Sequence, residues 1–135
     1  MDSFKPAAAV FAMLLATASA AAGLSPGDAE RGEKLYDRCI ACHSIDRDRT
    51  GPRHEGLVGR RVGSIPGFPY SAAMKEAGAR GMVWDESTLD GFLENPLKFL
   101  PGTRMTYAGI RDPQQRADLI EFLKEAGGQE RAQSR

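Results

Sequence analysis

The chain has 135 residues, a length typical of a single domain, and 18 basic residues balance 18 acidic ones. This balance argues against a nucleic-acid-binding protein, because such proteins are strongly basic. Two cysteines are too few for a disulfide framework, and the frequent glycines (15) and prolines (8) predict many turns between short elements.

Residues 1–22 have the pattern of a secretory signal peptide. Lys5 gives a weakly basic start, residues 7–18 form an apolar run, and small residues follow at 18–22. We expect cleavage near residues 20–22 and export of the mature chain. An uncleaved membrane anchor is the alternative, but the run is shorter than the roughly 20 residues that span a bilayer.

The first helix of the mature chain is expected to begin within residues 25–28, with Ser25 as N-cap and Pro26 at the first position. Its expected apolar stripe consists of Ala29, Gly32, Tyr36 and Ile40. A glycine inside a helix costs about 1 kcal/mol relative to alanine. Gly32 therefore indicates the close approach of another helix, with a merely tolerated glycine as the alternative.

The central motif is Cys39-Ile40-Ala41-Cys42-His43, the C-x-x-C-H pattern of a c-type haem attachment site. In a helical turn the two thiols and the imidazole share one face. The thiols can then form thioether bonds with the vinyl groups of one porphyrin, and His43 can bind the iron. A zinc site would need two more ligands at matching spacing, and a thioredoxin-like pair would need a βαβ pattern. The sequence has neither.

Residues 44–68 have no lasting periodicity and are rich in glycine, proline and arginine. So long an irregular segment suits a compact domain only if it wraps something, and a haem is such a group. Pro52 offers a carbonyl without an N–H and can accept the Nδ1 hydrogen bond that orients a ligating imidazole. Arg60 is a candidate partner for a haem propionate.

Three further helices and one short turn are expected in the rest of the chain. A helix at 71–77 has Ser71 as N-cap and Gly78 as its stop. A helix capped by Asp85 ends before Pro96, and residues 96–100 make one more turn. The last helix begins at 112–115 and stops at 127–128. No strand is convincing, so we expect an all-α domain at 23–128 and a flexible C-terminal tail at 129–135.

The second axial ligand of the iron has four candidates: His54, Met74, Met82 and Met105. Met74 and Met82 stand where methionine usually belongs to the core. His54 follows His43 by only 11 residues and would need a tight wrap around the haem edge. Met105 lies in a loop after a Pro-Gly turn, far enough along the chain to reach the opposite face, and is favoured. His/Met ligation raises the reduction potential and suits electron transfer.

Nine segments together carry a family resemblance: residues 27–32, 39–43, 51–52, 56–60, 66–70, 83–84, 92–96, 101–105 and 118–120. Through them the chain resembles the class I cytochromes c, which include mitochondrial cytochrome c and soluble bacterial cytochromes c. The resemblance extends from Gly27 to about Ala126. It implies the small cytochrome c fold, in which the N- and C-terminal helices cross, and shorter helices and long loops wrap one covalently bound haem c.

The resemblance also implies a role for each site residue. Cys39 and Cys42 attach the haem, His43 and Met105 are the axial ligands, and Pro52 accepts from His43. Tyr70 and Trp84 match residues that hydrogen-bond a propionate, with Arg60 nearby, and Phe92 and Thr103 match residues beside the methionine. The crossing of the end helices is expected to join Gly32 and Tyr36 to Leu119 and Phe122.

The chain departs from the family at a few positions. His54 replaces a leucine that usually packs near the haem, and Phe92 replaces a tyrosine. Leu97 and Asp112 stand at positions that are usually basic. The remaining basic residues on that face are Arg38, Lys98, Arg104 and Arg111.

The expected function is that of a soluble periplasmic one-electron carrier and not of an enzyme. Its expected partners are a quinol:cytochrome c oxidoreductase as donor and a terminal oxidase or photosynthetic reaction centre as acceptor, with the protein itself a monomer. One alternative is a haem peroxidase or gas-binding sensor with a labile sixth ligand. Another is a binding module without a cofactor.

Overall fold

The computed structural model describes residue 1 and residues 23–133, with side chains up to residue 128. The expected signal peptide therefore lies outside the described residues, apart from Met1, and stays a prediction. Within the described residues five helices form the fold: α1 (Ala29–Tyr36), α2 (Ala72–Ala79), α3 (Glu86–Glu94), α4 (Pro96–Phe99) and α5 (Pro113–Gln133). In residues 23–133 the one β-type pairing is an isolated bridge between Arg61 and Val83, so the all-α prediction is confirmed.

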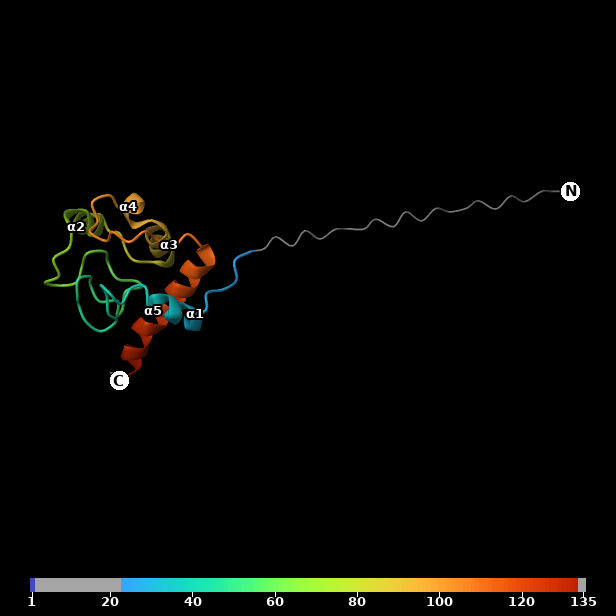
Figure 1. Cartoon of the computed structure of the whole chain (residues 1–135), viewed down its shortest axis with the longest axis horizontal. Coiled ribbons are helices and arrows are strands. Elements are labelled where there is room, and N and C mark those ends of the chain that lie inside the picture. Colours follow the sequence, from blue (N-terminus) through green and yellow to red (C-terminus); the bar gives the residue numbers. More distant parts are fainter. Residues whose placement is uncertain (2–22, 134–135) are drawn as a thin grey trace.

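The two end helices, α1 and α5, pack closely against each other, and α3 packs against α5, with α2 and α4 farther from this crossing (Figure 1). A Cβ on Gly32 would overlap the carbonyl oxygen of Asp118 in α5. One turn further on, the Tyr36 ring tilts against Phe122, with centroids 5.2 Å apart. The close approach expected at Gly32 is therefore confirmed. None of the described helices has the length and apolar character needed to span a bilayer.

The start of α1 differs from the prediction. Asp28 is the N-cap, and its side chain accepts from the N–H of Arg31 at 2.8 Å. Ser25, the expected cap, instead donates its N–H to Oε1 of Gln114 at 2.9 Å. Residues 25–27 are thus tied to the first turn of α5 and lie before α1, whose N-cap is Asp28. Ile40 is 48% exposed beyond the end of the helix, so its expected place in the apolar stripe is wrong.

The crossing of α1 and α5 also holds a polar cluster centred on Asp118. Its carboxylate accepts from Arg31 at 2.8 and 2.9 Å, from the N–H of Asp28 at 2.9 Å, and from Gln114 at 3.0 Å. These donors, Arg31 above all, lower the pKa of Asp118 from 3.8 to about 2. The carboxylate therefore stabilises the fold above pH 3.8, and this contribution is lost as the pH falls toward 2.

Asp118→Asn is expected to lower the free energy of unfolding at pH 7 by about 1–2 kcal/mol, because charged hydrogen bonds are lost and Arg31 is partly screened by water. The difference from wild type should shrink between pH 4 and pH 2. Denaturant unfolding at both ends of that range measures it. Asp37→Asn, at the exposed C-cap of α1, is the control and should unfold as wild type does. A difference that persists at pH 2 would contradict the assignment.

Local capping sets the starts of the later helices, at the predicted residues Ser71, Asp85 and Asp112 and also at Asn95, which is not among the predicted caps. Side chains of Ser71, Asp85 and Asn95 cap α2, α3 and α4, accepting from the N–H three residues ahead at 3.1, 2.7 and 3.0 Å. At α5 the carboxylate of Asp112 accepts from the N–H of Gln114 at 2.8 Å. These four starts follow from residues close in sequence.

Two expected helix stops are wrong. Gly78 lies inside α2, where a Cβ would overlap the carbonyl oxygen of Val62, so this glycine serves close packing. At the other end of the chain α5 runs past Gly127 and Gly128. Neither has the positive φ of a helix-ending glycine, and a Cβ on Gly127 would lie 2.8 Å from the backbone nitrogen of Gly56. Whether residues 129–135 form a flexible tail stays a prediction.

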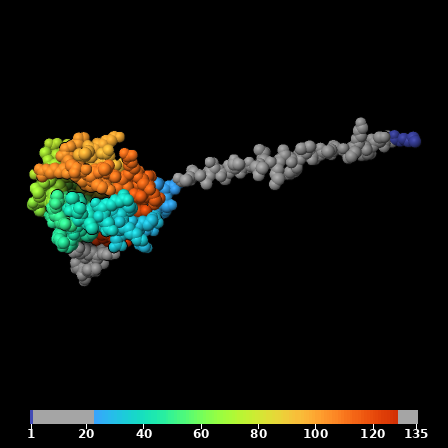
Figure 2. Space-filling model, in the orientation of Figure 1, coloured from blue at the N-terminus to red at the C-terminus, as the bar shows by residue number. Residues whose placement is uncertain are grey.

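The segment 44–68 is irregular, as expected, and is joined to the residues before α3. The N–H of Gly59 donates to the carbonyl of Trp84 at 2.8 Å, and Trp84 donates back to Arg60 at 2.9 Å. On the face shown in Figure 2, the cyan segment near residue 40 borders the orange segment near residue 105. These two segments carry the predicted haem motif and the favoured methionine.

Candidate haem-binding site

A cavity with a volume of about 490 Å³ gathers the predicted site residues. This volume lies within the range of about 300–1,000 Å³ that is typical of cofactor pockets. All ten predicted side chains line it: Cys39, Cys42, His43, Pro52, Arg60, Tyr70, Trp84, Phe92, Thr103 and Met105. They come from sequence positions up to 66 residues apart, so only the tertiary fold brings them together.

The motif after α1 forms a single helical turn. The carbonyl of Cys39 accepts from the N–H groups of Cys42 at 3.1 Å and of His43 at 2.9 Å. The turn is held from outside by Arg49, which donates to the carbonyl of Ile40 at 2.5 Å. Cys39 is partly buried, and this burial raises the pKa of its thiol to about 11, whereas Cys42 is exposed. The two thiols and the imidazole therefore reach the same cavity, as the spacing predicts.

The His43 imidazole is held in the tautomer that a metal ligand needs. Its Nδ1 lies 2.8 Å from the carbonyl oxygen of Pro52. A carbonyl can only accept, so Nδ1 carries the proton and Nε2 keeps a free lone pair. Burial also lowers the pKa of His43, which favours the neutral ring. The backbone of Gly51 packs so close that a Cβ there would overlap the ring.

The four candidates for the second axial ligand differ in whether, and where, they line the cavity. Met74 and Met105 line the cavity, whereas Met82 packs against the core and does not line it. The N–H of Met105 donates to Oγ1 of Thr103 at 3.4 Å.

His54 also lines the cavity, but its ring stacks on His43 with centroids 4.2 Å apart and an angle of 22°. Two imidazoles on opposite sides of an iron would face each other edge-on, so stacked rings cannot be opposite axial ligands. Burial lowers the pKa of His54 well below its usual value, and the adjacent His43 and Arg60 lower it further.

The polar groups of the cavity wall are fixed by the irregular segment. The guanidinium of Arg60 donates to the carbonyls of Glu55 at 3.0 Å and Arg53 at 2.9 Å. The hydroxyl of Tyr70 accepts from the N–H of Ile65 at 3.3 Å, and burial raises its pKa. Such a cationic and phenolic wall suits the carboxylates at a haem edge.

The donor set fits a covalently bound haem. Two thiols, an imidazole with a free Nε2 and a thioether project into one cavity, whose remaining wall is largely aromatic and aliphatic. A zinc site is not supported, because in the described residues no group of three or more His, Cys, Asp and Glu side chains is arranged to hold a metal ion.

Comparison with known proteins decides the family. The family model described as "Cytochrome c" matches residues 29–127. The chain belongs to the cytochrome c family. It is 45% identical over 105 residues to cytochrome c from Sesamum indicum, covering 75% of this chain and 92% of the relative. It is 44% identical over 125 residues to cytochrome c2 from Rhodomicrobium vannielii, covering 90% of this chain and 95% of the relative.

A solved structure supports the same conclusion. Cytochrome cH from Methylobacterium extorquens is similar with a TM-score of 0.69 and 39% sequence identity, covering 73% of this chain and 99% of that structure. As a member of this family the protein is an electron carrier with one covalently attached haem c, and it is not an enzyme.

Sequence reasoning missed part of the wall of this cytochrome c cavity. Helical periodicity marks Leu89, Leu93, Leu119 and Leu123 as buried faces but cannot tell a core position from a cofactor contact. Tyr107 and Ile110 lie in a loop without periodicity, so no local signal identifies them. The fold shows their place, because the N–H of Ile110 donates to the carbonyl of Leu93 at 2.8 Å.

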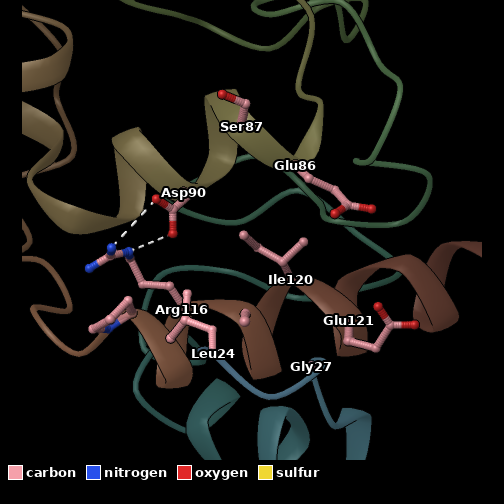
Figure 3. A pocket seen from close by; sticks show the side chains of 10 residues that line it. Leu24, Gly27, Glu86, Ser87, Asp90, Arg116, Ile120 and Glu121 are labelled. Carbon is pink, nitrogen blue, oxygen red and sulfur yellow. Dashed lines mark hydrogen bonds and ion pairs between the residues drawn. The ribbon is translucent and has the colours of Figure 1, made fainter. Parts of the chain in front are cut away.

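A second cavity of about 360 Å³ lies between α3, α5 and the segment before α1 (Figure 3). Across it Arg116 donates to Asp90 at 2.7 Å and also binds the carbonyls of Ile110 and Arg111, each at 2.9 Å. Its lining contains no cysteine, histidine or methionine. The haem motif therefore faces the cavity of about 490 Å³ and not this one.

Proposed function

We propose that this cytochrome c is a soluble periplasmic one-electron carrier with a His/Met-ligated haem. Cys39 and Cys42 form the thioether links, and Nε2 of His43 and the sulfur of Met105 bind the iron. The observation that carries the proposal is the convergence of both thiols, the Pro52-oriented imidazole and Met105 on one cavity. The haem iron supplies reversible one-electron chemistry.

The protein residues set the conditions for that chemistry. His43 and Met105 would both bind the iron, so substrates would be kept away and only outer-sphere transfer would remain. Pro52 orients His43. Arg60, Tyr70 and Trp84 would hold the propionate edge, and Phe92 and Thr103 would lie beside Met105. Burial in the largely apolar cavity and thioether ligation both raise the reduction potential.

The cellular setting belongs to the same proposal. The signal-like residues 1–22 support export to the periplasm, outside the bacterial cytoplasm, where thioether-bound haem is attached. A quinol:cytochrome c oxidoreductase is the proposed donor, and a terminal oxidase or photosynthetic reaction centre the acceptor. Arg38 and Arg104 are exposed and line the cavity, so they bring positive charge to its opening. We expect the monomeric protein to bind acidic partners at this opening in transient, salt-sensitive encounters.

The test is spectroscopy on the holoprotein made in a host that attaches c-type haem. We expect reversible one-electron reduction, low-spin iron in both states, and the weak red absorption of iron–thioether ligation in the ferric state. The ferrous protein should not bind carbon monoxide, whereas the same protein unfolded in guanidinium should bind it, which shows that the assay works. Five-coordinate or bis-histidine iron would overturn the proposal and favour the peroxidase or gas-sensor alternative.

A further inference from the structure

Two polar side chains form a hydrogen-bonded pair in the wall of the haem cavity. The hydroxyl of Tyr36, at the end of α1, lies 3.0 Å from Nδ1 of His54, 18 residues further along the chain. Their rings meet edge-on, with centroids 5.7 Å apart. Both side chains line the cavity. Burying a polar group costs free energy unless the group is hydrogen-bonded. Here Tyr36 and His54 supply the hydrogen-bond partner for each other.

His54 is held at its backbone as well as at its ring. Its N–H donates to the carbonyl of Ser44, the residue after His43, at 3.0 Å, and its carbonyl accepts from Leu57 at 3.0 Å. The side chain is tied to α1 through Tyr36. The ring that stacks on His43 is therefore fixed from two independent parts of the fold.

The imidazole of His43 thus has three restraints. The Pro52 carbonyl binds one edge through Nδ1, the Gly51 backbone packs against the ring, and the His54 ring stacks on it at 4.2 Å. A single hydrogen bond at one edge lets a ring pivot about that contact. The stacked His54 ring opposes this pivot, because the two planes are only 22° apart.

We propose that Tyr36 and His54 form a positioning pair that sets the plane of the His43 imidazole and lowers the reduction potential of the haem. This proposal rests on the proposed function in one respect, namely that His43 is the axial ligand. Neither member of the pair binds the iron. The oxidised haem carries one more positive charge than the reduced haem, and polar groups beside it stabilise that charge better than hydrocarbon does.

The experiment compares the holoprotein with Tyr36→Phe, His54→Leu and the double variant. Tyr36→Phe removes only the hydroxyl and keeps the ring that packs on Phe122. His54→Leu should raise the ratio of reduced to oxidised protein at a fixed ambient potential at least threefold, which is about 28 mV at 59 mV per tenfold. Tyr36→Phe should shift the ratio in the same direction by less. It should add nothing in the His54→Leu background, because the hydrogen bond is already gone.

A second readout reports the ring plane itself. The paramagnetic proton shifts of the haem methyl groups in the ferric state depend on the orientation of the axial imidazole, and they should change in both single variants. Phe122→Leu is the matched control, because it disturbs the packing of Tyr36 on α5 but leaves the hydrogen bond. It should change stability while the methyl shifts and the potential stay as in wild type.

Two results would overturn the proposed positioning pair. One is a wild-type potential with wild-type methyl shifts in both single variants. The other is a shift of potential in the double variant that equals the sum of the two single shifts. If His54→Leu does not fold, Tyr36→Phe and the Phe122→Leu control still decide between the outcomes. Failure of the proposed function is distinguishable, because it would appear in the wild-type spectrum as iron without His/Met ligation, whatever the variants show.

Discussion

Met105→Ala is expected to abolish the weak red absorption of the ferric protein and to open the iron to external ligands. Alanine cannot supply the thioether sulfur, so cyanide or imidazole should bind ferric iron at concentrations that leave wild type unchanged. The reduction potential should fall by on the order of 0.1 V, a modest part of the roughly 0.8 V that axial ligands span. Optical spectra and a redox titration of the holoprotein measure both effects.

The matched control is Met74→Leu, because Met74 is the other methionine that lines the cavity. Leucine fills a similar volume without a sulfur, so the red absorption and the potential should stay close to those of wild type. The opposite pattern, with the absorption lost in Met74→Leu and kept in Met105→Ala, would move the ligand assignment to α2. Retention in both single variants would argue against thioether ligation by either residue.

Features that depend on neighbours in sequence were predictable. The caps at Ser71, Asp85 and Asp112 each use a side chain to satisfy an N–H two or three residues ahead, so the signal and the structure are equally local. The turn at Cys39 is local too, since one carbonyl accepts from residues three and four positions later. The same applies to Pro52, which lacks an N–H whatever its environment.

Features decided by distant contacts were not predictable from local patterns. Ser25 looks like an N-cap, but its N–H donates to Gln114 in α5. The N-cap of α1 is Asp28, and the helix begins at Ala29. Gly78 and Gly127 look like helix stops, but each lies where another backbone approaches. The position of His54 on the His43 side of the cavity depends on Tyr36 and on the path of the irregular segment.

The close approach at Gly32 has a large expected effect on stability. Alanine there would place a Cβ on the backbone carbonyl of Asp118 and against the Cβ of Phe122, at 2.8 Å. A side chain can change rotamer, but a helix carbonyl cannot move unless α5 moves with it. The two helices must separate, and the packing of Tyr36 on Phe122 is weakened as a result.

We therefore expect Gly32→Ala to lower the free energy of unfolding of the holoprotein by at least about 3 kcal/mol, although alanine is the better helix former by about 1 kcal/mol. Gly128→Ala isolates that helix propensity, because Gly128 also lies in a helix, has no positive φ, and has nothing within 4 Å of an added Cβ. It should be neutral or stabilising. Guanidinium unfolding followed by far-UV circular dichroism measures both variants. If Gly32→Ala were as stable as Gly128→Ala, α1 and α5 would have to pack less closely than the Asp118 contact requires. α1 ends at Tyr36 and leads directly into the Cys39 turn. The distance between α1 and α5 therefore also fixes the positions of the haem motif and of the positioning pair.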